Sequence, residues 1–268
     1  MEIKMEDIKQ LRERTGAGMV DCKKALEESG GDIEKAVEIL RKKGIAKAAK
    51  RSEREAGEGI VLVAANDAGD EGYILEINSE TDFVARNEKF QKLAEAVFNV
   101  VKNNKPKDLD ELMNQTMDGG TVKESLDSLS GTIGEKLGIK RFAVLTGACV
   151  AAYSHAAGRI GVLLSLDKAG ENELAKDMAM QVVAASPRYL NREQVLPEEV
   201  EKEKEIYREN LAKEGKPEPI MEKIIAGKLD KYFEEVCLLE QEYIKDDKKK
   251  VKDILGEVKV EKFLRYSL

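Results

Sequence analysis

The chain has 268 residues, and its 45 lysine and arginine residues against 52 aspartate and glutamate residues give a formal net charge of −7. With 42% hydrophobic and 36% charged residues, the composition indicates a soluble, ordered protein of one large domain or two to three small ones. The acidic balance disfavours binding to nucleic acid through phosphate neutralisation, and no apolar run approaches the roughly 20 residues that cross a bilayer.

Residues 1–45 show hydrophobic residues at helical spacing in three short stretches, which predicts three helices that each bury one stripe. The stripes are Ile8 and Leu11, then Met19, Cys22, Ala25 and Leu26, then Ile33, Ala36, Val37 and Leu40. Glycine-containing turns separate these stretches, and Asp32 is a suitable N-cap for the third helix. Residues 46–58 contain no large apolar residue and are predicted to be a charged linker that is partly helical.

Residues 59–197 contain a weak internal repeat in which two apolar runs joined by a turn precede a helical pattern. The predicted strands are 60–65 and 72–78 in the first copy, and about 148–153 and 160–166 in the second. The helices begin near Asn87 and Asn172, and the second ends at Ser186-Pro187. A duplicated β-hairpin and helix predicts an α+β core. Between the copies a helical period runs through Val122, Leu126, Leu129, Ile133 and Leu137.

Residues 198–236 differ from the repeat, because two charged amphipathic helices flank Gly215-Lys216-Pro217. This pattern predicts an antiparallel helical hairpin that projects from the body. The tail from Cys237 to Leu268 returns to strand-like runs and is expected to complete the second core unit. The expected core subdomains are therefore 59–140 on one side and 141–197 with 237–268 on the other.

Residue patterns typical of enzymes are nearly absent from the sequence. His155 is the single histidine and no cysteine pair has CxxC spacing, so we expect no metal site, no cofactor and no enzymatic activity. Thr15-Gly16-Ala17-Gly18 lacks the strand and the lysine of a phosphate-binding loop and is predicted to be a turn between helices, without direct nucleotide binding. Glu76 and Glu80 are expected to be ordinary solvated carboxylates. The three scattered cysteines and an amino terminus unlike a signal or transit peptide predict a cytoplasmic protein.

The connection at residues 79–86 is the most informative segment. The second repeat copy joins strand to helix through a polar turn, whereas the first uses a longer connection that carries Phe83 and Val84. One interpretation is that Thr81 or Asp82 caps the following helix while Phe83 packs into the core. The other is that Phe83 is presented to a partner protein. The pattern alone leaves both open.

Four runs of residues together resemble the bacterial translation elongation factor Ts family over essentially the whole chain. They are 11–19 with 21–26, Glu76 to Ala85, His155 with 159–163, and Gly215-Lys216-Pro217. The four runs together are specific for the family because their order and spacing match it. A single run would not be specific. The resemblance implies a ubiquitin-associated-like (UBA-like) module over 1–45, a duplicated α+β core, and an inserted antiparallel coiled-coil hairpin over 198–236.

The resemblance also implies a function, namely binding to GDP-bound and nucleotide-free elongation factor Tu and release of its GDP during translation elongation. Thr81, Asp82, Phe83 and Val84 match the family loop that enters beside the nucleotide site of this GTPase and acts on its Mg²⁺. The other positions that match partner-binding residues of the family are Leu11, Arg12, Met19, Val20, Lys23, Ile133, Gly134, His155 and Ile244.

Three departures from the family pattern limit this resemblance. Val20 replaces a common second methionine, and Ala156-Ala157-Gly158 replace a more glycine-rich turn. The chain stops at Leu268, where longer members continue into an extension that contacts the GTPase, so that contact is not expected here.

Other readings of the sequence remain open. The Met19 turn suits an adaptor for a ubiquitin-like protein, the basic strip from Lys42 to Arg54 suits an RNA-associated factor, and an enzyme of unknown type is the third alternative.

Overall fold

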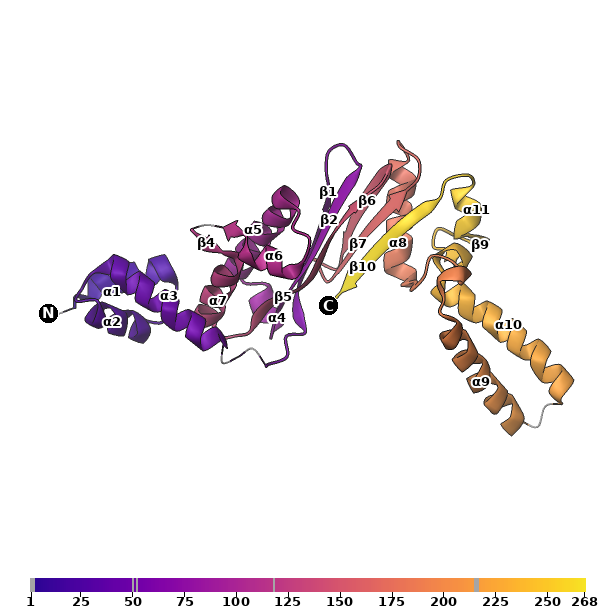
Figure 1. Ribbon diagram of the computed structural model, residues 1–268, viewed down its shortest axis with the longest axis horizontal. Helices are drawn as coiled ribbons and strands as arrows, with labels where there is room; N and C mark the ends of the chain where they lie inside the picture. Colours follow the sequence, from indigo (N-terminus) through magenta and orange to yellow (C-terminus); the bar gives the residue numbers. More distant parts are fainter. Residues whose placement is uncertain (1–2, 50, 52, 118, 215–216) are drawn as a thin grey trace.

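The computed structural model describes residues 3–49, 51, 53–117, 119–214 and 217–268. Figure 1 shows an elongated molecule with a helical module at the amino-terminal end, two β-sheets with their helices in the middle, and a projecting pair of helices at the other end. The mixed α+β class predicted from the sequence is confirmed.

The amino-terminal module consists of α1 (Met5–Thr15), α2 (Met19–Glu28) and α3 (Ile33–Ala49), so the three predicted helices are confirmed. Its core is formed by the predicted stripes, with Leu11, Cys22, Ala25 and Leu26 fully buried. Met19 is the exception, since it was expected in the stripe of the second helix but is 41% exposed at the first position of α2. The Asp32 carboxylate accepts a hydrogen bond from the Lys35 N–H (3.1 Å), which caps α3 as expected. Helix α3 continues past residue 45, so the start of the predicted linker is helical.

The first sheet has the antiparallel order β1-β2-β5, formed by β1 (Glu58–Ala65), β2 (Glu71–Ser79) and β5 (Leu137–Thr146). Its outer face is covered by α5 (Glu88–Asn104), whose Phe90, Ala94, Val97 and Val101 are buried. The remaining elements of this unit are α4 (Asp82–Ala85), α6 (Leu109–Asn114), β3 (Thr116–Met117), β4 (Gly120–Thr121) and α7 (Val122–Ile133).

Strand β5 corrects the sequence-based picture in two ways. Helix α7 ends at Ile133, and Leu137, which the helical period includes, instead begins the strand. Gly134 ends the helix because it adopts φ +93°, a left-handed conformation that favours glycine. The expected subdomain boundary between residues 140 and 141 falls inside β5, which pairs with β2 as far as Thr146.

The second sheet has the order β10-β7-β6, formed by β6 (Cys149–His155), β7 (Ile160–Leu166) and β10 (Val260–Ser267). Helix α8 (Asn172–Ala185) packs on it through Ala175, Met178 and Val182. Both predicted hairpin-and-helix copies are therefore confirmed, as is the return of the tail to this unit. The unit also contains two 3-10 turns (Arg192–Gln194 and Leu238–Glu240), β8 (Glu242–Tyr243), β9 (Asp246–Lys250) and α11 (Val251–Leu255).

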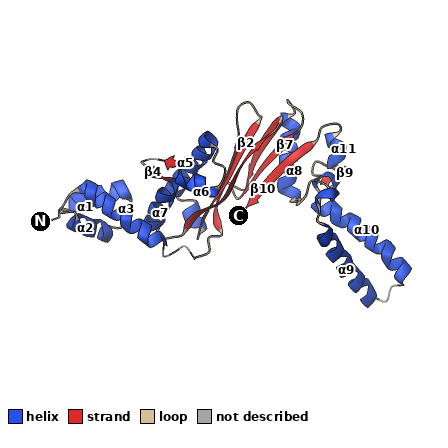
Figure 2. Cartoon of the chain, viewed as in Figure 1, coloured by secondary structure: helices blue, strands red, loops and turns tan. Residues whose placement is uncertain are grey.

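The two sheets pack face to face in the middle of the molecule (Figure 2). Val61 and Ile74 of the first sheet and Leu163 and Tyr266 of the second are buried between them. The Val61 N–H donates to the Gly158 carbonyl (2.7 Å), which ties the β6–β7 turn to β1. The core is thus a helix–sheet–sheet–helix stack, and the turn that follows His155 is held against the first sheet.

The projecting hairpin is formed by α9 (Pro197–Lys213) and α10 (Glu218–Val236). The two helices pack through a small apolar cluster that includes Leu211, Ile225 and Leu229. Arg192 anchors the base of the hairpin by pairing with Glu240 (2.7 Å) and Asp230 (2.8 Å). The predicted break at Gly215-Lys216 lies outside the described residues, and the coiled-coil and UBA-like assignments stay predictions.

The expectation that Glu76 is a solvated carboxylate is wrong. Its side chain is fully buried and accepts hydrogen bonds from Lys140 Nζ (2.8 Å) and Arg141 Nε (2.7 Å) of β5. The Arg141 guanidinium in turn lies 4.0 Å from the centre of the Tyr266 ring on β10. Glu80 is also engaged, since it accepts from the Lys136 N–H (2.6 Å). Glu76 therefore joins two strands of the first sheet and, through Arg141, links them to the second.

This arrangement predicts a loss of stability in acid. Burial raises the pKa of Glu76, but the hydrogen bonds and charges of Lys140 and Arg141 outweigh it and lower the pKa overall. The pKa of Glu76 is lower in the folded state than in the unfolded state. Its contribution to the free energy of unfolding is therefore fully present above the unfolded-state pKa and is lost as pH falls through the folded-state pKa. We expect Glu76→Gln to lower the free energy of unfolding at neutral pH by about 2 kcal/mol and to weaken its dependence on acid, measured by urea unfolding. Glu173→Gln, at an exposed carboxylate, is the control; equal acid dependence of Glu76→Gln and the parent would contradict the prediction.

Candidate protein-binding site

The segment that carries Phe83 forms α4, a single helical turn. The Thr81 side chain caps it by accepting a hydrogen bond from the Val84 N–H (3.4 Å). Val84 and Ala85 are buried in the first core, whereas Phe83 is 82% exposed, more than any other large hydrophobic residue that the structure describes. Thr81 therefore caps α4 and not the following helix α5, whose N-cap is Asn87, so the predicted cap is displaced by one element; the packing of Phe83 into the core is wrong.

Glu135 holds α4 in place from the end of α7. Its carboxylate accepts hydrogen bonds from the Thr81 N–H (3.0 Å) and from the Thr81 hydroxyl (2.7 Å). Its own carbonyl accepts from the Ser130 hydroxyl (2.6 Å). Ile133 and Gly134, which the sequence predicts as contact residues, immediately precede Glu135 and so adjoin α4. Sequence reasoning missed Glu135, although its place directly after a helix-ending glycine is a signal for such a clamp.

The turn between β6 and β7 lies at the same end of the sheets as α4. Asp82 pairs with Arg86 (2.8 Å) one helical turn ahead. Arg159 pairs with Glu58 of β1 (2.7 Å); this hydrogen bond, the charge of Glu58 and the nearby charge of Asp82 raise the pKa of Arg159. His155 is exposed at the start of this turn, with its ring stacked near Tyr153 at 6.1 Å between centres. The structure thus places the predicted segments at 81–84 and 133–134 beside each other, and the turn that begins at His155 lies at the same end of the first sheet.

The amino-terminal module presents a second set of predicted residues. Met19 and Val20 are 41% and 68% exposed at the start of α2, and Arg12 and Lys23 are exposed. Arg12 lines a surface depression together with Lys89 of α5, so this edge of the module adjoins the helix that follows α4. Leu11 is a correction: its side chain is fully buried in the module core, so it supports the module from within and is no longer a contact candidate.

Ile244 is not brought to this surface. It is 45% exposed in the turn between β8 and β9 of the second unit. In Figure 1, β9 lies beyond the second sheet, on the side away from the first.

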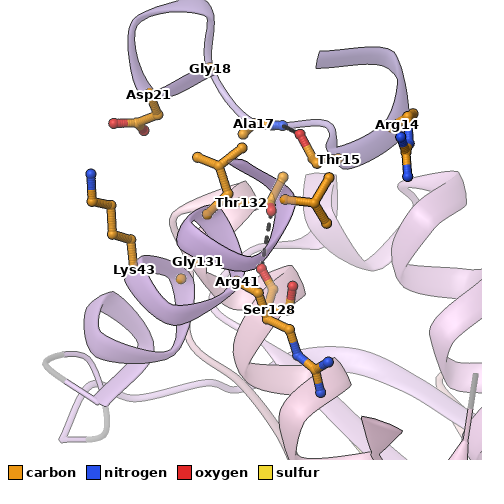
Figure 3. A pocket seen from close by; sticks show the side chains of 13 residues that line it. Arg14, Thr15, Ala17, Gly18, Asp21, Arg41, Lys43, Ser128, Gly131 and Thr132 are labelled. Atoms are coloured by element: carbon orange, nitrogen blue, oxygen red, sulfur yellow. Dashed lines mark hydrogen bonds between the residues drawn. The ribbon is translucent and has the colours of Figure 1, made fainter. Parts of the chain in front are cut away.

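The module is joined to the core where α3 packs against α7. A Cβ atom on Gly131 would lie 2.3 Å from the Gly44 Cα, so only glycine lets the two helices approach this closely. A pocket of about 250 Å³ lies at this junction, between the turn after α1, helix α3 and helix α7 (Figure 3). The cations that line it are already paired: Arg14 with Glu34 (2.8 Å), Lys43 with Glu28 (2.6 Å) and Arg41 with Glu124. The pocket is therefore a feature of the junction and not an anion site.

The described residues contain no group of three or more histidine, cysteine, aspartate or glutamate side chains that could bind a metal ion. Over the same part of the chain, no helix has the length and apolar character needed to cross a bilayer. All three cysteines are free and buried, and burial raises the pKa of Cys237 to about 11.

An exposed aromatic residue on a clamped helical turn, delivered by an α+β core with a helical module attached, defines a protein-binding factor. The family model described as Elongation factor TS matches residues 80–268. Elongation factor Ts of Chlorobium phaeobacteroides (strain BS1) is 46% identical over an alignment 284 positions long, which covers 100% of this chain and 99% of that relative. The chain belongs to the elongation factor Ts family, and its role is that of a guanine nucleotide exchange factor for elongation factor Tu.

Proposed function

We propose that this chain binds elongation factor Tu in its GDP-bound and nucleotide-free states in the cytoplasm and releases GDP by inserting α4 beside the nucleotide site. The observation that carries the proposal is the 82% exposure of Phe83 on a turn whose neighbours Val84 and Ala85 are buried. An aromatic side chain held out of the core in this way is suited to enter an apolar gap in a partner. Release of GDP then allows GTP to bind.

The mechanism is one of linked binding. A GTPase holds GDP through backbone N–H groups around the phosphates and through Mg²⁺. An exchange factor forms and breaks no covalent bond; it binds the nucleotide-free state more tightly, and the nucleotide must weaken its binding by the same factor. Each tenfold loss of GDP affinity requires about 1.4 kcal/mol of differential contact, which burial of one aromatic ring is large enough to supply.

Asp82 is proposed to disturb the Mg²⁺ environment of the partner. Its carboxylate is 40% exposed, and among the described residues its ion-pair partner is Arg86, which is itself 77% exposed. Because exposed ion pairs contribute little, the carboxylate exchanges partners at small cost. It therefore remains available to the cation or to the groups that position it.

Rigid attachment of α4 supports the wedge. The hydrogen bonds from Thr81 to Glu135 and the cap on Val84 fix the turn before the partner arrives. A turn that is already ordered loses little conformational entropy on binding, so more of the contact energy is available to distort the GTPase. Met19, Val20, Arg12 and Lys23 of the module are proposed as the anchor that keeps α4 at the nucleotide site, and Ile244 as a separate contact of the second unit.

The alternative of an RNA-associated factor is not favoured by the basic strip. Lys42 pairs with Glu38 (2.7 Å), Lys43 with Glu28 (2.6 Å) and Arg54 with Glu80 (3.1 Å). These pairs reduce the positive charge that the strip offers to phosphates.

The proposed function is tested by stopped-flow release of a fluorescent GDP from elongation factor Tu, with and without this chain. We expect a release rate that rises with the concentration of the chain and saturates. An unchanged release rate under conditions where the two proteins form a complex would overturn the proposal.

The clamp on α4 gives a further prediction. Glu135→Ala removes both acceptors for Thr81, so we expect GDP release at saturating protein to slow several-fold and the free energy of unfolding to fall by about 1 kcal/mol. Glu135→Gln keeps one carbonyl oxygen and should give an intermediate release rate. A Glu135→Ala rate equal to that of the parent would show that the clamp does not position α4.

A further inference from the structure

A depression spans the amino-terminal module and the core. It has a volume of about 310 Å³ and is lined by Lys9, Arg12, Glu13 and Gly16 of the module together with Lys89 of α5. A Cβ atom on Gly16 would overlap the Lys89 Nζ and would lie 3.3 Å from the Lys89 Cε. The ammonium group of Lys89 therefore lies against the turn that ends α1, across the boundary between module and core.

The depression carries an excess of positive charge, although the whole chain has a net charge of −7. Three of its five lining residues are cationic and one is acidic. Within the described ranges, Lys9, Arg12 and Lys89 form no ion pair, either with Glu13 or with any other residue. Like charges that share one depression repel each other, so an anionic group that entered it would be stabilised.

Lys89 occupies a position that does not suit its own helix. Helix α5 begins at Glu88, so Lys89 lies in the first turn, where the helix dipole favours anions and disfavours cations. Lys92, on the next turn of α5, is paired with Glu88 (2.6 Å), whereas Lys89 lies against the module. Residues that break a local preference are expected at functional sites.

The two sides of the depression lead directly to residues proposed to contact the partner. On the module side, Arg12 is itself one of them, and Met19 begins α2 just after the turn that Lys89 touches. On the core side, Lys89 follows the α4 turn that carries Phe83. Arg12 and Lys89 are both exposed. A group bound between them would therefore connect the anchor in the module to the helix that follows the wedge.

We propose that a carboxylate of the partner GTPase bridges Arg12 of the module and Lys89 of the core, and thereby fastens the module to α5. This inference rests on the proposed function and adds to it both Lys89 and the chemistry of the group that Lys89 binds. A single aspartate or glutamate side chain can serve both cations, because its two carboxylate oxygens accept separate charge-assisted hydrogen bonds. The joint between module and core is then completed by the partner, which couples binding at the module to the position of α4.

The test measures the Kd of the complex between the full chain and nucleotide-free elongation factor Tu by isothermal titration calorimetry. We expect Lys89→Met, which removes the charge and keeps a long side chain, to raise the Kd about fivefold in low salt. High salt should reduce this difference, because it screens the charges. Lys89→Arg keeps the charge and should retain the parent Kd. The matched control Lys92→Met removes a charge from the next turn of α5 and should stay within about twofold of the parent.

A double-mutant cycle tests the bridge itself. If one carboxylate joins the two cations, either single substitution already breaks the bridge. The Kd of the double variant Arg12→Met, Lys89→Met should therefore rise by less than the product of the two single effects. A rise equal to that product would show that Arg12 and Lys89 act independently, and the bridge would be refuted.

The remaining outcomes separate this inference from the proposed function. A parent Kd in Lys89→Met, or equal weakening in Lys92→Met, would overturn the bridge even if the parent chain accelerates GDP release. The expected Kd values without any acceleration of GDP release by the parent chain would support the bridge and refute nucleotide exchange. Absence of binding by the parent chain would overturn both.

Discussion

Replacing Phe83 with alanine is expected to slow GDP release from elongation factor Tu about tenfold at saturating concentrations of this chain. The ring is 82% exposed, so nothing in the chain's own fold depends on it, and the free energy of unfolding should change by less than about 0.5 kcal/mol. A large functional loss without a loss of stability is what distinguishes a wedge from a core residue. Stopped-flow release of fluorescent GDP and urea unfolding measure the two quantities.

Two further variants sharpen this test. Leu196→Ala truncates another exposed hydrophobic residue, 61% exposed just before α9, and should leave GDP release unchanged. Val84→Ala truncates the buried neighbour of Phe83 and should instead lower the free energy of unfolding by about 1 kcal/mol. If Phe83→Ala weakens complex formation but releases GDP at the parent rate once saturated, Phe83 is an anchor and not a wedge.

Hydrophobic periodicity was sufficient to predict the helices of the module and both hairpin-and-helix copies, because each of these elements buries one regular face. It failed at β5 for a physical reason. Glu76 pairs with Arg141 while Ile77 pairs with Ile139, so the ladder has a bulge at Lys140 that interrupts alternation. The apolar residue Leu137 also continues the period of α7, and only the left-handed conformation of Gly134 separates the helix from the strand.

The geometry of the proposed site could not be predicted from the sequence. A short helix that buries Val84 and Ala85 leaves its third hydrophobic residue exposed, and the pattern of the sequence cannot say which of the three that is. The clamp joins Thr81 to a residue 54 positions away, a contact that no local signal contains. At Leu11 the resemblance points to a side chain that is buried in the module core, whereas its neighbour Arg12 is exposed.

Replacing Gly131 with leucine is expected to raise the concentration of this chain needed for half-maximal GDP release by about tenfold or more, while the release rate at saturation is kept. A Cβ atom there would lie 2.3 Å from Gly44 Cα and 2.7 Å from the Gly44 carbonyl oxygen, both of which are backbone atoms that cannot turn aside. Helix α3 must therefore move away from α7, and the module loses its fixed position beside the core.

The half-maximal concentration and the release rate at saturation respond differently because the module anchors the complex, whereas α4 acts on the nucleotide site. A displaced module no longer holds α4 at a high effective concentration near the nucleotide site, so more protein is needed to fill the complex. Phe83 and the hydrogen bonds from Thr81 to Glu135 lie outside the α3–α7 contact. Once the complex has formed, it should therefore still release GDP at the parent rate. Leucine has a higher helix propensity than glycine, so the substitution does not weaken α7 itself. The matched control is Lys123→Leu, which introduces leucine on the exposed face of α7. Small-angle scattering should show a change in the overall dimensions of Gly131→Leu alone; an unchanged half-maximal concentration despite that change would mean that the module does not anchor the complex.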